Sequence, residues 1–187
     1  MRRSAICFLG IFLPAIAGWS SSAAANEVSI CGVEDLTGKQ LEKVTSAFAK
    51  KDPQQVVEVV GDIEKRCRPR VSKDIWKNDD FRRFMYAETV EFSFRQLLLR
   101  RGYDMDAVDH RLNMQCNFAD FAAQYPEGEF NPRGSKLLDG AEVDADQHGR
   151  RIQGDDKLYL KLYVVAQAHR WQKGPSLGIL PACQVSN

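Results

Sequence analysis

The sequence predicts an all-α fold built from stacked antiparallel helix hairpins. Apolar residues recur at helical spacing in one stretch after another, capping residues precede those stretches, and glycine or proline follows them. The alternating pattern of a half-buried strand is nowhere sustained. We therefore expect a helical protein without a β-sheet.

The N-terminus has the pattern of a secretory signal peptide. Arg2 and Arg3 precede an apolar run over residues 6–17, and a stretch of serines and alanines follows. The apolar run is shorter than the roughly 20 residues that a transmembrane helix needs. We expect residues 1–25 to be removed on export, which leaves a single helical domain over residues 26–187. This domain is expected in the periplasm or outside the cell, without a membrane anchor.

Two helices are predicted at the start of the mature chain. Thr37 and Gln40 match a capping box, and the apolar spacing that follows predicts a helix over residues 38–50. Asp52 before Pro53 marks the start of a second helix, whose apolar face is rich in valine. The short link between the two helices predicts a tight helix hairpin.

A long helix is predicted in the middle of the chain. Residues 68–78 have mixed charges and a proline, which indicates a connector, and Asn78 or Asp79 then caps a helix that ends at Arg101. This helix is apolar on more than one side, as expected of a central core helix. Gly102 follows it and can adopt the left-handed conformation that ends a helix.

Two further helices complete the predicted fold. One covers residues 106–124, and a loop with two prolines and two glycines follows over residues 126–136. Asp155 caps the last helix, which is predicted over residues 156–172. The apolar tail over residues 177–183 is expected to pack back onto the body of the protein.

Two segments repeat one another at a separation of 38 positions. Residues 98–107 and 137–145 both contain two leucines followed by glycine, and each predicts a helix end at its glycine, Gly102 or Gly140. These segments resemble the ankyrin repeat, and residues 49–56 resemble the turn between its two helices. The period of 38 and the missing Thr-Pro-Leu-His signature depart from that family, whose usual period is about 33. The resemblance implies stacked helical units that bind another protein; an irregular helical domain is the alternative.

Four cysteines remain after the signal peptide, namely Cys31, Cys67, Cys116 and Cys183. In an exported chain they predict two disulfides, for which three pairings are possible. The predicted first hairpin brings Cys31 close to Cys67, which favours that bond and leaves Cys116 to pair with Cys183. The wide, single spacings do not match a four-thiolate zinc site.

The charge balance argues against a nucleic-acid partner. Removal of Arg2 and Arg3 with the signal peptide takes the basic count from 26 to 24 against 25 acidic residues, so the mature net charge is near −1. Residues 144–149 resemble the start of a calcium loop, but Asp155 stands where that loop needs a glutamate. We expect no metal ion and no cofactor.

The sequence favours a protein-binding module over an enzyme. Motifs of serine hydrolases, zinc hydrolases and nucleotide-binding proteins are absent from it. The two repeated turns supply the predicted binding residues, which are Arg100, Arg101, Tyr103, Asp104, Asp106, Asp144 and His148. The expected partner is a protein, and the concrete version is an immunity or inhibitor protein that binds a toxin or a cell-wall hydrolase.

A second arginine-rich segment has the composition of a binding hot spot. Arg82 and Arg83 lie among the aromatic residues Phe81, Phe84 and Tyr86. A solvated helix face explains the same two arginines without a partner.

Two other functions stay open. A small periplasmic hydrolase could use His169 as a base, with Asp155, Asp156 or Glu88 as its carboxylate. A His169 side chain that faces a carboxylate in an open cleft would favour this hydrolase. An envelope scaffold or a host-interaction factor would have the same helical pattern.

Overall fold

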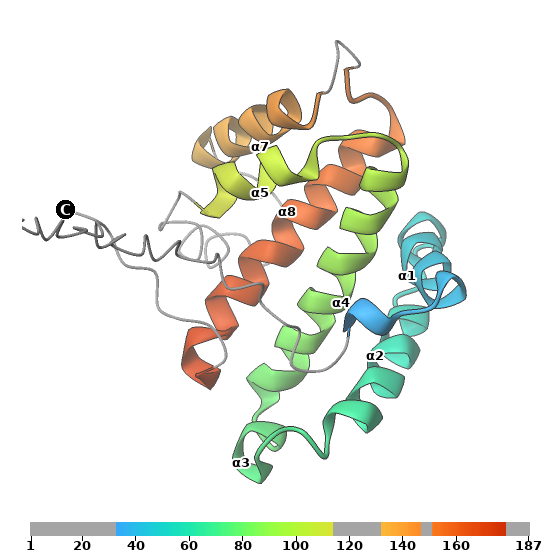
Figure 1. Cartoon of the computed structure of the whole chain (residues 1–187), viewed down its shortest axis with the longest axis vertical. Coiled ribbons are helices and arrows are strands. Elements are labelled where there is room, and N and C mark those ends of the chain that lie inside the picture. The colour runs from blue at the N-terminus through green and yellow to red at the C-terminus, as the bar shows by residue number, and fades with distance from the viewer. Residues whose placement is uncertain (1–32, 114–131, 147–150, 179–187) are drawn as a thin grey trace, which may run out of the picture.

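The computed structural model describes residues 33–113, 132–146 and 151–178, and in these ranges the chain is helical (Figure 1). The described part contains seven α-helices, two 3-10 helices and no strand, so the predicted all-α class is confirmed. None of the described helices has the length and apolar character needed to span a membrane. The elements in chain order are η1 (Val33–Asp35), α1 (Gly38–Lys50), α2 (Gln54–Cys67), α3 (Lys73–Trp76), α4 (Asp79–Arg100), α5 (Met105–Asn113), α7 (Pro132–Ala145), α8 (Asp155–Lys173) and η2 (Pro175–Leu177).

The long helices α4 and α8 lie side by side and antiparallel through the middle of the molecule (Figure 1). Two ion pairs mark the antiparallel arrangement: Lys173 at the end of α8 pairs with Asp80 at the start of α4, and Asp156 at the start of α8 pairs with Arg101 just after α4. Both helices supply fully buried side chains to the core, among them Phe84, Phe94, Leu98, Leu160 and Tyr163. Each such side chain contributes about 1.5–3 kcal/mol of hydrophobic stabilisation.

The α1–α2 hairpin packs against α4. The predicted capping box begins α1: the Gln40 N–H donates to Thr37 Oγ1 at 3.3 Å, and the Thr37 N–H donates to Gln40 Oε1 at 3.0 Å. Lys51 ends α1 in the left-handed conformation, with φ of 54°, and the chain turns back into α2. Val44 and Val56, one on each helix, are fully buried in the core.

Helices α5 and α7 pack against each other near the end of α4 that leads into α5 (Figure 1). The Asp104 N–H donates to the Ala145 carbonyl at 3.1 Å, which joins the turn before α5 to the end of α7. Arg111 of α5 also forms a two-point ion pair with Asp144 of α7, in which Nη2 donates to Oδ1 at 2.9 Å. The two repeated turns of the sequence are therefore neighbours in space.

The two repeated segments nevertheless adopt different structures. Gly102 has φ of 84° and ends α4, as predicted. Gly140 lies inside α7, which continues to Ala145, so the predicted helix end at Gly140 is wrong. A Cβ atom at Gly140 would lie 2.8 Å from Arg111 Nη1, so this glycine permits the close approach of an α5 side chain. The ankyrin-like nature of the chain stays a prediction.

The other predicted boundaries agree with the structure to within a residue, with two exceptions. The helices predicted over residues 38–50 and 156–172 are confirmed, and the helix predicted from Asp106 begins at Met105, although its predicted end lies outside the described residues. The predicted connector before α4 contains the short helix α3. The loop predicted up to residue 136 is wrong from Pro132 onward, because α7 begins there and proline suits the first turn of a helix. The predicted caps Asp52 and Asp155 are also wrong, because Pro53 and Gly154 stand at the N-cap positions of α2 and α8.

The disulfide prediction involves mostly residues outside the described ranges. Cys67 is fully buried at the end of α2 and is not a free thiol. Cys31, Cys116 and Cys183 lie outside the described residues, as does the predicted signal peptide over residues 1–25. The pairing of Cys31 with Cys67 and of Cys116 with Cys183 therefore stays a prediction.

Candidate functional site

The turn between α4 and α5, where binding residues were predicted, is fastened to the start of α8. Tyr103 Oη donates to Asp156 Oδ2 at 2.7 Å, and Arg101 forms an ion pair with the other oxygen of the same carboxylate. The Arg101 guanidinium lies 5.0 Å from the centre of the Tyr159 ring, a cation–π distance. Because only 4% of the Tyr103 surface is exposed, this side chain belongs to the packing of the turn.

The predicted binding carboxylates also make contacts within the chain. Asp104 Oδ1 accepts a hydrogen bond from the Ala107 N–H at 2.9 Å and so caps α5. Asp106 pairs with Arg95 of α4 at 2.5 Å, and Asp144 pairs with Arg111. Five of the seven predicted residues thus make contacts within the chain, namely Arg101, Tyr103, Asp104, Asp106 and Asp144. Of the other two, Arg100 is exposed at the end of α4 and His148 lies outside the described residues. Partner binding by this turn stays a prediction.

A buried tyrosine–carboxylate contact lies next to this turn. Tyr163 of α8 donates its hydroxyl hydrogen to Asp109 of α5, and Arg95 Nε donates to the other Asp109 oxygen at 2.9 Å. Burial, followed by the nearby Glu91 and Asp109 carboxylates, raises the pKa of Tyr163 well above 10. Tyr163 therefore stays protonated at physiological pH and acts as a fixed hydrogen-bond donor that joins α8 to α5.

Two of the three carboxylates predicted for a hydrolase, Asp155 and Asp156, lie far from His169. Asp155 and Asp156 start α8, and His169 follows 13 to 14 positions later, which places them about 20 Å apart along the helix axis. Gln172 hydrogen-bonds the half-buried His169 side chain, and burial lowers the pKa of His169 below 6.5, with the nearby positive charge of Lys173 acting in the same direction. Glu88, the third predicted carboxylate, is buried on α4, and the hydrolase stays a prediction.

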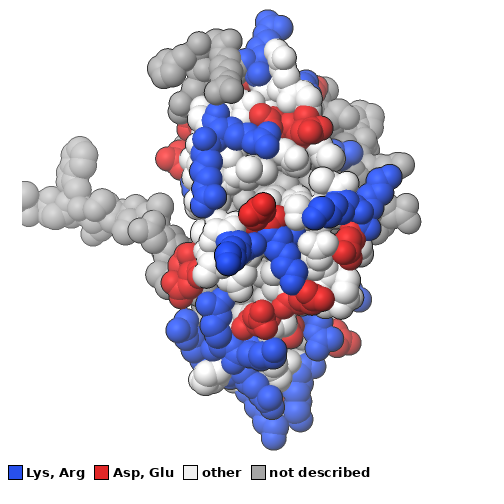
Figure 2. All heavy atoms as spheres, turned by 90° about the vertical axis from the view of Figure 1, so that its right-hand side faces the viewer, with Lys and Arg blue, Asp and Glu red and all other residues white. Residues whose placement is uncertain are grey.

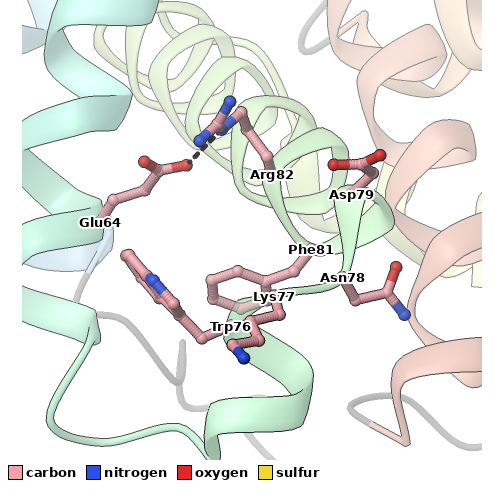
Figure 3. Close-up of a pocket in the computed structure, with 7 residues that line it drawn as sticks. All are labelled: Glu64, Trp76, Lys77, Asn78, Asp79, Phe81 and Arg82. Atoms are coloured by element: carbon pink, nitrogen blue, oxygen red, sulfur yellow. Dashed lines mark hydrogen bonds and ion pairs between the residues drawn. The ribbon is translucent and has the colours of Figure 1, made fainter.

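A pocket lies at the other end of the molecule, between the end of α2, α3 and the start of α4 (Figure 3). Its volume is about 210 Å³. Two aromatic side chains form its apolar wall: the rings of Trp76 and Phe81 lie with their centres 5.8 Å apart and their planes tilted by 54°. Polar side chains complete the lining, namely Glu64, Lys77, Asn78, Asp79 and Arg82.

The N-caps of α3 and α4 position Trp76 and Phe81, the two aromatic side chains of the pocket wall. The Ser72 hydroxyl accepts a hydrogen bond from the Ile75 N–H and starts α3, and Asn78 Oδ1 accepts one from the Asp80 N–H at 2.9 Å and starts α4. The chain therefore turns sharply between the two helices, and Trp76 at the end of α3 meets Phe81 on the first turn of α4. Phe81 is buried and fixes one side of the wall, whereas Trp76 is half-buried.

Charged side chains surround the pocket opening. Glu64 of α2 and Arg82 of α4 face each other, with Arg82 Nε 3.3 Å from Glu64 Oε1 (Figure 3). The side chain of Glu64 is 17% exposed, whereas that of Arg82 is 79% exposed. The Arg68 guanidinium lies 5.6 Å from the centre of the Trp76 ring, so a cation already covers part of this ring.

The pocket lies in a basic region of the described surface. Residues 64–83 contain eight basic and four acidic residues, whereas the whole chain is nearly balanced with 26 and 25. All eight basic side chains are exposed, and Figure 2 shows lysine and arginine gathered at the lower end of the molecule, where α2 ends and α3 lies. We call this surface the basic tip; it consists of Lys65, Arg66, Arg68, Arg70, Lys73, Lys77, Arg82 and Arg83.

Only Arg82, Arg83 and Phe81 of this site were predicted from the sequence. Trp76 and Lys77 lie in a segment that was predicted only as a connector. The signal that could have revealed them is the run of basic residues around a single tryptophan in a chain whose total charge is near zero.

Comparison of the chain with protein-family models, with curated proteins and with solved structures gives no match.

Proposed function

We propose that the protein is an exported, non-enzymatic binding module that holds a partner protein at the basic tip. The observation that supports this proposal is the pocket beside Trp76 and Phe81, which basic side chains surround. Pockets for small-molecule ligands usually enclose about 300–1,000 Å³, so a pocket of about 210 Å³ suits one side chain of a partner protein better than a metabolite. Aromatic and arginine side chains are also the residues most enriched at the energetic centre of protein interfaces.

The basic tip is a better binding surface than the turn between α4 and α5. A partner at that turn would compete with internal contacts, such as those of Asp156 with Tyr103 and of Asp144 with Arg111. If a binding partner displaced one member of a part-buried ion pair, the other member would lose its counter-charge. The energetic cost of that loss opposes binding. At the tip, exposed cations such as Lys73 can gain a contact without losing one.

The finer form of the proposal is an immunity or inhibitor protein that occludes a toxin or a cell-wall hydrolase in the periplasm. The predicted signal peptide and the even number of mature cysteines support an oxidising location outside the cytoplasm. A small pocket with a charged surround supports recognition of one dedicated protein, because specificity needs groups that reject the wrong partner.

Capture from the native envelope extract tests this function. The immobilised oxidised protein is compared with three variants: the tip variant Lys77→Glu/Arg83→Glu, the variant Arg100→Glu at the turn between α4 and α5, and the control Lys39→Glu, whose side chain is exposed on α1. We expect one partner at comparable amounts on the wild type, Arg100→Glu and Lys39→Glu, and its loss from the tip variant. Loss from Arg100→Glu alone would move the site to the predicted turn, and no partner on the folded wild type would contradict a binding function.

A further inference from the structure

We infer that the basic tip recognises an acidic segment of its partner, with one aliphatic or aromatic side chain of that segment in the pocket beside Trp76 and its flanking carboxylates on the surrounding lysines and arginines. This inference rests on the proposed function and adds the chemistry of the partner. Three features of the described residues carry it: the cations around the pocket, the balanced charge of its lining, and the absence of exposed large apolar side chains at the tip.

The first feature is the supply of cations. Arg66, Arg70, Lys73, Lys77 and Arg83 are exposed, and within the described part of the chain no ion pair is recorded for any of them. Acidic side chains of a partner can therefore pair with them without displacing an internal carboxylate. Complementary charge of this kind raises the association rate and selects against basic partners.

The second feature decides which part of the partner enters the pocket. Glu64 and Asp79 line it together with Lys77 and Arg82, so the lining has no net charge and offers a carboxylate no net attraction. The wall formed by Trp76 and Phe81 offers apolar surface to an uncharged side chain instead. The arrangement thus separates the two kinds of contact: an apolar group fits inside the pocket, and carboxylates fit around it.

The third feature distinguishes a protein from a membrane or a nucleic acid. Among the described residues the exposed large apolar side chains are Val57, Leu99, Val143 and Leu158, and none of them belongs to the tip. The apolar side chains at the tip, such as Trp76, are half-buried or buried rather than exposed, so the tip has little apolar surface to insert into a bilayer. Four carboxylates also lie among the eight basic residues of positions 64–83, and they would repel a phosphate backbone.

Tryptophan fluorescence provides a readout at the pocket itself. The chain has three tryptophans, so Trp19→Phe with Trp171→Phe leaves Trp76 as the only one in the full-length protein. Three twelve-residue probes are added to this variant: an aspartate- and glutamate-rich peptide with one central leucine, the same peptide with alanine for leucine, and the same peptide with lysine for every acidic residue. Vesicles containing anionic phosphatidylglycerol and a single-stranded oligonucleotide serve as probes of the two other anionic surfaces.

We expect the acidic leucine peptide to change the Trp76 emission and to bind more weakly as salt rises. Alanine for leucine is expected to weaken binding several-fold, and the lysine peptide is expected to leave the emission unchanged. Lys77→Glu/Arg83→Glu is expected to weaken binding of the acidic peptide at least about tenfold, whereas Lys39→Glu/Lys50→Glu, which makes the same charge change on α1, leaves it within about twofold.

Several results would overturn the inference. These are equal losses in the tip and α1 variants, equal affinity for the leucine and alanine peptides, or tighter binding of the vesicles or the oligonucleotide than of the acidic peptide. The proposed function is judged separately by capture of a protein from the envelope extract. A partner that depends on the tip but has no acidic segment would reject this inference and leave the binding function in place.

Discussion

Arg170 Nε of α8 lies 2.6 Å from Glu91 Oε2 of α4, and the two side chains are only 11% and 12% exposed. This buried ion pair joins the two longest helices where each faces the other. Removing a charge from water is costly, and the attraction between these two side chains offsets part of that cost. The pair therefore makes the packing of α4 on α8 depend on both of its charges.

Loss of one member of this pair is expected to destabilise the fold strongly. Glu91→Gln removes the negative charge that lies 2.6 Å from the buried Arg170 guanidinium, and we expect a loss of about 3 kcal/mol in the free energy of unfolding. Urea unfolding followed by circular dichroism measures it. Replacement of both residues, as Glu91→Leu with Arg170→Met, is expected to cost less than the sum of the two single changes.

An exposed ion pair supplies the control. Lys65 and Asp62 pair on α2 at 3.3 Å with side chains that are 81% and 61% exposed, so Asp62→Asn is expected to change stability by less than about 0.5 kcal/mol. A similar loss for Asp62→Asn and Glu91→Gln would show that burial does not govern the strength of these pairs.

Two helical glycines are expected to respond differently to alanine. Around Gly61 in α2 there is open space for a Cβ atom, so Gly61→Ala is expected to stabilise the protein by about 0.5–1 kcal/mol. A Cβ at Gly140 would displace the Arg111 guanidinium from Asp144, so Gly140→Ala is expected to lose most or all of that gain. Thermal unfolding of both variants gives the comparison.

The Arg111→Ala variant separates two effects of Gly140→Ala, namely the gain in helix propensity and the clash of the added Cβ with Arg111. In an Arg111→Ala protein the guanidinium is absent, and Gly140→Ala should then stabilise by about as much as Gly61→Ala does. If Gly140→Ala has the same effect with and without Arg111, the close approach of the two helices does not explain this glycine.

The contrast between Gly102 and Gly140 shows what the sequence can and cannot predict. Helix caps are local, so Thr37 and Gly102 were sufficient to place the start of α1 and the end of α4. The same two leucines followed by glycine describe Gly140, where the deciding neighbour is Arg111 on another helix. A local pattern cannot distinguish a glycine that ends a helix from one that admits a distant side chain.

The contacts at the candidate site also depend on residues that are distant in the sequence. Asp106 and Asp144 look like free carboxylates in the sequence, but their partners Arg95 and Arg111 lie 11 and 33 positions away. The pocket likewise forms only when the turn before α4 places Trp76 against Phe81 and both against the end of α2. Residue types were therefore predictable, whereas their pairing depended on how the helices pack.

Removal of the Tyr103 hydroxyl is expected to affect stability without affecting partner binding. Tyr103→Phe loses the 2.7 Å hydrogen bond to Asp156, and we expect a loss of about 1 kcal/mol in the free energy of unfolding. Tyr159→Phe is the matched control, because its ring stacks on Phe94 and no hydrogen bond is recorded for its hydroxyl within the described part of the chain. Weaker partner capture by folded Tyr103→Phe would support the predicted turn over the basic tip.

The stability of the protein is expected to fall as the pH drops below about 6.5, in part because of His169. Burial, together with the positive charge of Lys173, lowers the pKa of His169 in the folded state, whereas the unfolded chain keeps a pKa near 6.5. Between those two pKa values the unfolded state binds more protons, so acid favours unfolding. His169→Gln removes this proton, and its stability relative to the wild type should therefore improve from pH 7.5 to pH 5.5. Urea unfolding at both pH values measures the change, and His110→Gln, at an exposed position on α5, is the comparison variant. An equal relative improvement in the two variants would contradict a role for the burial of His169.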